Sequence, residues 1–423
     1  MSQEVHKKLI KKIFYKGTLV NKTAFKIGSS EGDFIDSMCL KDKSDKPYIS
    51  ATSLAGVLKS ELGECLLLGT ENNKNKKSEK SRLVLNDCYL DEKSNYQISV
   101  RNGVKINPTT NIAEDKALFD YEVISAGSDF VFESEINIYE NDNLDDDIKA
   151  YENILQSEIN IGAKTMSGFG RFAFKDTENN KLELKKYEFS FPNDFEKYKD
   201  FLNNSKNAQC QILEKQDKKL GFIIKIDLDI TNSLLIGSVN NDDENAKLAS
   251  LKENGKFIAS GTSFKGAIKN QALKIVNTFN LGEDFIDELF GYAADKSTET
   301  KKAGDTQKSR VRVSESEIKN AMEKLHQRNK IDRFSGATID GALFDAKVLY
   351  DGKINLNIEL KNPSPKEKAL MLFVARDLCT GFLAVGGGKN VGRGVFKGKF
   401  NAYENGKELS KSEMNEIAKE LLK

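Results

Sequence analysis

The sequence contains no tryptophan, only two histidines, five prolines and five cysteines among 423 residues. The cysteines form no CxxC pair, and only His6 and His326 could complete a ligand set, so no zinc site with recognisable spacing can be assembled. An odd number of cysteines without a signal peptide favours a reducing cytoplasm. No apolar run approaches the roughly 18 residues of a membrane span, so we expect no membrane partner.

An excess of charge of one sign is also missing, because the net charge is +1 although 30% of the residues are charged. This balance gives no global attraction to nucleic acids, so an RNA-binding or DNA-binding site must be a local patch. The hydrophobic content of 39% is enough for packed cores and argues against a disordered chain. The length favours two to three domains.

Two stretches carry the same residue types in the same order, Tyr48–Lys59 and Phe257–Lys269. Each is typical of a short extended segment, a polar turn and then a helix. We expect a threonine and serine pair in each stretch to cap the helix, because hydroxyls can accept hydrogen bonds from the free N–H groups of the first turn. These pairs are Thr52 with Ser53 and Thr262 with Ser263.

A glycine lies in the first turn of each predicted helix, at Gly56 and Gly266, where the missing side chain lets another backbone approach. Lys59 accompanies the first glycine, and Lys265 and Lys269 accompany the second. A helix N-terminus with small residues and a nearby lysine suits a phosphate. The alternative interpretation is an ordinary capped helix.

The two stretches belong to a longer internal repeat, since four landmarks recur in one order. This pattern indicates a tandem duplication of one domain, because its period is far too long for a solenoid. We expect a first domain at residues 1–195, a linker at 196–216 and a second domain at 217–423. The paired landmarks are Ile-Gly-Ser at 27–29 and 236–238, TSxxGxxK at 52–59 and 262–269, Ala-Leu-Phe-Asp at 117–120 and 342–345, and glycines 168 and 170 with 392 and 394.

Each half has the order β–α–β–β–α–β with insertions, which predicts an α+β chain of two ferredoxin-like, RRM-like domains. The two helices should cover one face of an antiparallel sheet and leave the other free, as in RNA-binding members of this architecture. We interpret the polar insertions at 101–119 and 308–344 as protruding arms, the second with a charged helix that contains His326. In the second arm, Arg333 offers charge and Phe334 could wedge against an unstacked base.

A glycine-rich loop enters the last strand of each half, at 161–175 and 385–400. Its glycines permit positive φ angles and could bring backbone N–H groups up to a ligand. Lys164 and Lys389 lie inside the loops, and Arg171 and Arg393 lie close to their ends. The loops therefore predict a nest for phosphates, with a tight surface hairpin as the alternative.

Taken together, these motifs resemble the RAMP superfamily of CRISPR-associated proteins, and in particular two fused backbone subunits of a type III effector complex. The resemblance covers most of the chain except the linker and the C-terminal tail. It implies subunits that grip a CRISPR RNA, pair it with a target RNA, contact other subunits of the superfamily and project a thumb-like hairpin between guide and target. The candidate RNA-binding residues are therefore Thr52, Ser53, Lys59, Lys164, Arg171, Thr262, Ser263, Lys265, Lys269, Arg333, Lys389 and Arg393.

Some members of the family cut target RNA with an aspartate in the loop after the first strand, with a divalent metal such as Mg²⁺ or Mn²⁺. Counted back from Ile49, Asp36 falls close to that position, and Asp243 is the nearest acid in the second half. Such a carboxylate can hold a metal ion or position a 2′-hydroxyl for in-line attack at phosphorus. We therefore predict Asp36 and Asp243 as catalytic and metal-binding residues.

Three alternatives stay open at this point. The chain could be a scaffold without catalysis, or a stand-alone endonuclease that processes precursor CRISPR RNA, often with a histidine as acid or base. Neither histidine is well placed for that role in the sequence. The third alternative is a phosphate-binding enzyme unrelated to CRISPR.

Overall fold

The computed structural model describes residues 7–28, 36–70, 78–107, 110, 112–203, 208–216, 221–239, 248–282, 284–293 and 305–422. Two compact units make up the chain. The first unit comprises Met1–Ser99, Tyr121–Ala163 and Gly170–Lys218, and the second comprises Val100–Asp120, Lys164–Phe169 and Lys219–Lys423. The second unit thus takes in the arm and part of the glycine loop of the first repeat.

Within the described residues, the first unit contains short and long strands around β1 and three α-helices. Its main sheet has the strand order β11-β10-β1-β7-β3, and β9 also pairs with β1. The strands are β1 (Leu9–Asn21), β2 (Tyr48–Ile49), β3 (Leu83–Leu85), β4 (Cys88–Tyr89), β7 (Asp129–Tyr139), β8 (Ile159–Asn160), β9 (Arg171–Phe174), β10 (Lys181–Ser190) and β11 (Gln211–Glu214), and the helices are α1 (Ala51–Leu62), α2 (Asp145–Leu155) and α3 (Phe195–Asn203).

The second unit repeats this plan around β12, with a sheet in the order β15-β16-β20-β23-β12-β24-β25 and β19 paired to β23. Its strands are β12 (Phe222–Ile230), β13 (Gly237–Val239), β14 (Leu248–Ser250), β15 (Lys252–Glu253), β16 (Lys256–Ala259), β17 (Tyr292–Ala293), β18 (Thr306–Gln307), β19 (Val311–Val313), β20 (Ser316–Lys319), β21 (Met322–Ile331), β22 (Thr338–Tyr350), β23 (Lys353–Leu360), β24 (Phe396–Glu404) and β25 (Lys407–Glu408). Its helices are α4 (Gly261–Thr278), α5 (Asp284–Phe290), α6 (Pro365–Thr380) and α7 (Lys411–Lys419).

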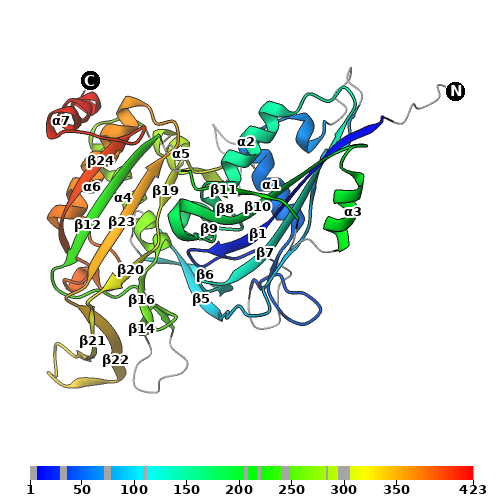
Figure 1. Ribbon diagram of the computed structural model, residues 1–423. Helices are drawn as coiled ribbons and strands as arrows, with labels where there is room; N and C mark the ends of the chain where they lie inside the picture. The colour runs from blue at the N-terminus through cyan, green and yellow to red at the C-terminus, as the bar shows by residue number, and fades with distance from the viewer. Residues whose placement is uncertain are drawn as a thin grey trace. The chain divides into compact units, whose positions relative to one another are not determined.

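In each unit the first and third strands of the β–α–β–β–α–β order lie side by side in the middle of the sheet, with the last strand on one flank and the second on the other. This is the ferredoxin-like arrangement that the sequence predicts. The alternation of buried and exposed residues along β12 lets α4 and α6 pack on one face, which Figure 1 shows beside β23 and β24. The two repeats therefore have the same fold.

Backbone hydrogen bonds repeat between the copies residue by residue. Each glycine loop closes onto the segment that follows the first strand, with donor–acceptor distances of 2.7–2.8 Å. Gly170 N donates to Ala24 O as Gly394 N donates to Ser233 O, and Ala163 N donates to Lys26 O as Gly387 N donates to Leu235 O. Such identity of local geometry supports a duplication of the whole domain rather than of a motif.

Both arms are two-stranded hairpins, formed by β5 (Ile98–Ile106) with β6 (Ala113–Ile124) and by β21 with β22. Their tips match, because Asn107 N donates to Ile112 O at 2.9 Å and Asp332 N donates to Ala337 O at 2.8 Å. The hairpin of β21 and β22 extends away from the sheet of its unit (Figure 1). The prediction of a charged helix around His326 is wrong, because that segment is strand β21, whose residues pair with β22 along its length.

The expectation of a free second sheet face fails in the first unit. There α3 packs against Phe14 of β1 and against Tyr187 and Phe189 of β10 through Phe201. Most of α3 lies in the segment predicted as a polar linker. Without this helix the aromatic rings would be exposed to water, and their burial under it stabilises the sheet. In the second unit Lys225, Asp227 and Asp229 are exposed on β12, so that strand keeps a polar outer side.

All five cysteines are free. Among the described helices, none combines the length and the apolar character needed to cross a membrane.

Candidate functional site

The first turns of α1 and α4 are built in the same way, but the cap lies two residues earlier than predicted. Ser50 Oγ accepts a hydrogen bond from Ser53 N, and Ser260 Oγ accepts one from Ser263 N, both at 3.2 Å. The cap residue must keep an extended backbone, and both of these serines have one, whereas the predicted pairs already lie inside the helix.

The hydroxyls of the predicted pairs contact these caps. Thr52 Oγ1 lies 3.0 Å from Ser50 Oγ, and Thr262 Oγ1 lies 2.8 Å from Ser260 Oγ. A hydroxyl can still accept a further bond when it donates to the cap. The proposed contact of these threonines and serines with RNA stays a prediction.

Gly56 and Gly266 are exposed, and a Cβ atom added to either would meet nothing within 4 Å among the described residues. Thr52, Gly56 and Lys59 recur at helical spacing, so they lie along one stripe of α1, and α4 has the same stripe. Glycine inside a helix costs about 1 kcal/mol relative to alanine, and the packing of neither unit explains that cost. We conclude that two duplicated helix surfaces leave open space for a close-approaching ligand.

Lys265, which directly precedes Gly266 in α4, has an unusual environment. Burial, followed by the charges of Lys269 and Arg312, lowers the pKa of its ammonium group to about 8. Its neighbours are partly neutralised, since Lys269 lies 3.7 Å from a carboxylate oxygen of Asp287 and Arg312 lies 3.0 Å from one of Glu359. Among the described residues no carboxylate pairs with Lys265 itself, so an anion brought to this surface would be stabilised.

The glycine that closes each loop is explained by the fold. A Cβ atom on Gly170 would lie 2.0 Å from Ile161 O, and one on Gly394 would lie 1.9 Å from Val385 O, so only glycine allows each loop to close. The amides of Gly170 and Gly394 already donate to backbone carbonyls. A phosphate could therefore be bound only by those loop amides that do not already donate to a backbone carbonyl.

The four predicted cations of the loops have different partners. Arg171 forms an ion pair with Glu158 at 2.7 Å, and Lys164 Nζ lies 4.6 Å from the ring centre of Phe119. Arg393 is only 6% exposed, and its Nη2 lies 3.2 Å from His326 Nδ1. Lys389 begins the short turn after Gly388 and is exposed. Only Lys389 has the exposure that a simple phosphate contact needs.

The tip of the β21–β22 hairpin is pre-ordered. Asp332 Oδ1 accepts hydrogen bonds from Phe334 N at 2.9 Å and from Ser335 N at 2.8 Å, and these bonds lower the pKa of Asp332. Phe334 is fully exposed and Arg333 lies beside it at the surface. An aromatic ring held out by a fixed turn can stack on or wedge between bases, as the sequence predicts.

Asp36 is exposed at the base of the first arm. The next residue, Ser37, bridges to Tyr121 of β6, and Ser37 O accepts hydrogen bonds from Lys26 Nζ at 2.8 Å and from Glu122 N at 3.0 Å. Asp243 lies outside the described residues. Within the described part of the chain, no group of three or more acidic, histidine or cysteine side chains could hold a metal ion.

Comparison with protein families decides the identity of the fold. The model of the RAMP superfamily matches residues 18–173 and again residues 227–397. The chain belongs to the RAMP superfamily. The two matched regions are the two repeats, so this is a double RAMP protein, and the family implies a CRISPR-associated, RNA-binding role together with other subunits of this kind. No curated protein matches the chain.

Sequence reasoning missed a buried ion cluster of this RAMP protein, inside the second unit. Arg101, on β5, is 3% exposed and donates hydrogen bonds of 2.6 Å to both Glu253 and Glu315. Its guanidinium also lies 4.9 Å from the ring centre of Phe169. Burial raises the pKa of Glu315 against the opposing effect of Arg101. A lone arginine in a polar arm gives no sequence signal for burial, because its partners are far away in the chain.

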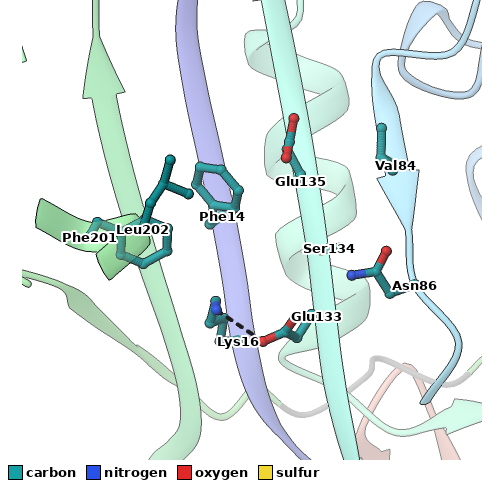
Figure 2. A pocket seen from close by; sticks show the side chains of 9 residues that line it. All are labelled: Phe14, Lys16, Val84, Asn86, Glu133, Ser134, Glu135, Phe201 and Leu202. Carbon is teal, nitrogen blue, oxygen red and sulfur yellow. Dashed lines mark ion pairs between the residues drawn. The ribbon is translucent and has the colours of Figure 1, made fainter. Parts of the chain in front are cut away.

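A further hollow lies on the first RAMP unit, over the sheet face that α3 partly covers (Figure 2). Lys16, Glu133 and Phe201 line it, and Lys16 Nζ forms an ion pair of 3.0 Å with Glu133. Because this cation is already neutralised, the hollow offers little to a phosphate. We therefore place the candidate RNA site on the helix stripes and arms instead.

Proposed function

We propose that this RAMP protein is a CRISPR RNA-binding backbone subunit of a type III effector complex, which holds the guide and its target along two successive repeats. The observation that carries this proposal is the open helix stripe at Gly56 and its copy at Gly266. The packing of the fold does not require a glycine at either position. The side chains of Lys59, Lys265 and Lys269 add positive charge to those stripes. In the sequence, each stripe is followed by one of the two hairpin arms, which would act as the thumbs. Grip on the RNA backbone would be independent of base sequence.

Purification of the chain from its native cells tests this role. We expect a discrete small RNA of constant length and further RAMP subunits to co-purify with the chain. Recovery of the chain alone, with no affinity for CRISPR RNA above that for an unrelated RNA of equal length and structure, would contradict the proposal.

A second candidate is cleavage of the target RNA at Asp36, favoured by its exposed position next to the base of an arm. Asp36 alone offers one carboxylate, which suits Mg²⁺ or Mn²⁺ only where RNA phosphate oxygens and water complete the coordination. Such an ion would supply Lewis-acid stabilisation of the phosphate, while the protein positions the strand.

Asp36→Asn should then abolish cutting of bound target RNA without changing its binding, and EDTA should do the same. Cutting that persists in both cases would leave the chain as a scaffold. The alternative of an endonuclease for precursor CRISPR RNA predicts cleavage of a repeat RNA by the chain alone. His326 does not favour it, because burial and the charge of Arg393 lower its pKa and it contacts Tyr350 Oη at 2.7 Å.

A further inference from the structure

Lys26 is a lysine whose charged end lies inside the first unit. The residue is only 6% exposed, and it belongs to the segment that follows β1. Its Nζ donates a hydrogen bond of 2.8 Å to Ser37 O and lies 5.3 Å from the ring centre of Tyr121. Burying an ammonium group costs free energy unless hydrogen bonds compensate for the lost water. A charge at this buried position therefore needs an explanation.

The second repeat shows that the fold does not need a lysine here. Lys26 O accepts a hydrogen bond from Ala163 N of the glycine loop. Leu235 O accepts the matching bond from Gly387 N in the second repeat, so Leu235 occupies the position of Lys26. This leucine is equally buried, at 6% exposed, and packs in an apolar cluster with Val348. An apolar side chain thus satisfies the packing at this position.

The segment that Lys26 holds is matched in the second repeat as well. Leu40 N donates to the carbonyl oxygen of the residue after Lys26 at 2.8 Å, and Leu251 N makes the equivalent bond in the second repeat at 2.9 Å. Asp36 lies four positions before Leu40, and Lys247 lies four positions before Leu251. The repeat with the candidate acid therefore has the buried lysine, and the repeat without an acid at that position has a leucine.

Lys26 holds the chain directly beside Asp36. Ser37 O is the carbonyl oxygen of the next residue, and it also accepts a hydrogen bond from Glu122 N at 3.0 Å. The Glu122 carboxylate in turn accepts a hydrogen bond from Cys39 N at 2.9 Å. The backbone after Asp36 is thereby held from the segment after β1 and from β6. A carboxylate on a backbone that is fixed in this way keeps one position when a substrate binds.

We propose that Lys26 is a positioning residue for cleavage of the target RNA. Its ammonium group fixes the peptide after Asp36, so that the carboxylate meets the scissile phosphate in one orientation. Lys26 is too deeply buried to be a main contact of the RNA, so it acts through the backbone that carries Asp36. The inference rests on the proposed cleavage at Asp36, and its two tests separate the failure of the one from the failure of the other.

The first test needs neither RNA nor cleavage. Lys26→Leu gives the first repeat the residue of the second, so we expect a folded chain with a melting temperature close to that of the wild type. Hydrogen exchange of the RNA-free, full-length chain is followed by mass spectrometry. The amides of residues 37–41 should exchange roughly tenfold faster or more in the variant, because a hydrogen bond from a charged group is lost. Unchanged exchange of these amides overturns the inference.

The second test measures cleavage of bound target RNA by the guide-loaded complex under single-turnover conditions. Lys26→Leu should slow cleavage roughly tenfold to hundredfold, because a displacement of about 1 Å near the reacting groups can cost ~10²-fold. The affinity for target RNA should not change. Lys26→Arg keeps a cationic donor that can lie on the ring of Tyr121, and it should regain much of the rate. Lys149→Met, at an exposed position of α2, is the control for the loss of one positive charge.

The combination of results distinguishes the two proposals. A wild-type complex that cuts and a Lys26→Leu complex that cuts equally fast overturn only the role of Lys26. A wild-type complex that does not cut refutes the proposed cleavage and this role together. Slower cutting with a proportional loss of target affinity also overturns the inference, because it would assign Lys26 to RNA binding. Should Lys26→Leu fail to fold, Lys26→Met takes its place in both tests, since methionine keeps the unbranched stem of lysine.

Discussion

Replacing Gly56 and Gly266 with alanine should stabilise the fold and weaken RNA binding at the same time. Both glycines lie inside helices, have no positive φ, and would place a new Cβ in open space among the described residues. Alanine then gains about 0.5–1 kcal/mol per site, because it removes backbone entropy from the unfolded chain. If an RNA backbone approaches these stripes closely, the same methyl groups must push it away.

The assay combines thermal unfolding with titration of a labelled RNA. We expect each substitution to raise the melting temperature by a few degrees, since about 1 kcal/mol shifts it by roughly 2–4 °C for a domain of this size. Affinity for RNA should fall in the single variants and further in the double variant. Asn415→Ala, on an exposed turn of α7, is the matched control, because it gains helix propensity away from both stripes. Stabilised glycine variants with unchanged RNA affinity would refute the assignment of the stripes.

Three further predictions concern charges. Arg101→Ala should lower the free energy of unfolding by about 3–5 kcal/mol in urea titrations, because it leaves two buried carboxylates without their cation. A loss below about 1 kcal/mol would contradict this explanation. Affinity for RNA should fall as the pH rises above about 8, because Lys265 then loses its proton, and Lys265→Gln should remove this dependence. The free energy of unfolding should rise over the same pH range, because the unfolded chain then binds more protons than the folded chain. Lys164→Ala with Lys389→Ala should flatten the salt dependence of binding, and an unchanged slope would show that the glycine loops do not hold phosphates.

Local signals in the sequence were sufficient for elements whose residues lie close together in the chain. Glycines and alternating apolar residues predict the strands, the capped helices and the loops, because turn chemistry and side-chain period act over a few residues. The two-residue shift of the caps shows the limit of this reasoning. Ser50 and Ser260 are as good caps as the residues that follow them, and only the extended backbone before the helix selects them.

Features that depend on distant partners could not be predicted. The segment of β21 is rich in charge and suits a helix locally, but pairing with β22 turns it into a strand. Arg101 shows the same effect for burial, because Glu253 and Glu315 reach it only in the folded unit. For the candidate site, sequence gave the lysines and glycines of the helix stripes, but the environment that depresses the pKa of Lys265 required the structure.

If the chain cleaves target RNA, the strand register of the two copies predicts the number of cuts. Ser37 bridges in parallel to Tyr121, and Leu248 pairs in parallel with Ala346 at the matching position of the second arm. The residue before Ser37 is Asp36, whereas the residue before Leu248 in the sequence is Lys247.

Lys247 is a cation, which cannot hold a divalent metal ion, and Asp243 lies four positions before it in the sequence. If the chain cleaves, we therefore expect a single cut per bound target rather than the two that an active pair of aspartates would make. Asp243→Asn should leave the fragment pattern unchanged and Asp36→Asn should abolish it, as read from end-labelled target RNA on a sequencing gel. Loss of one of two fragments in the Asp243→Asn chain would show that the second repeat uses a different register for its acid.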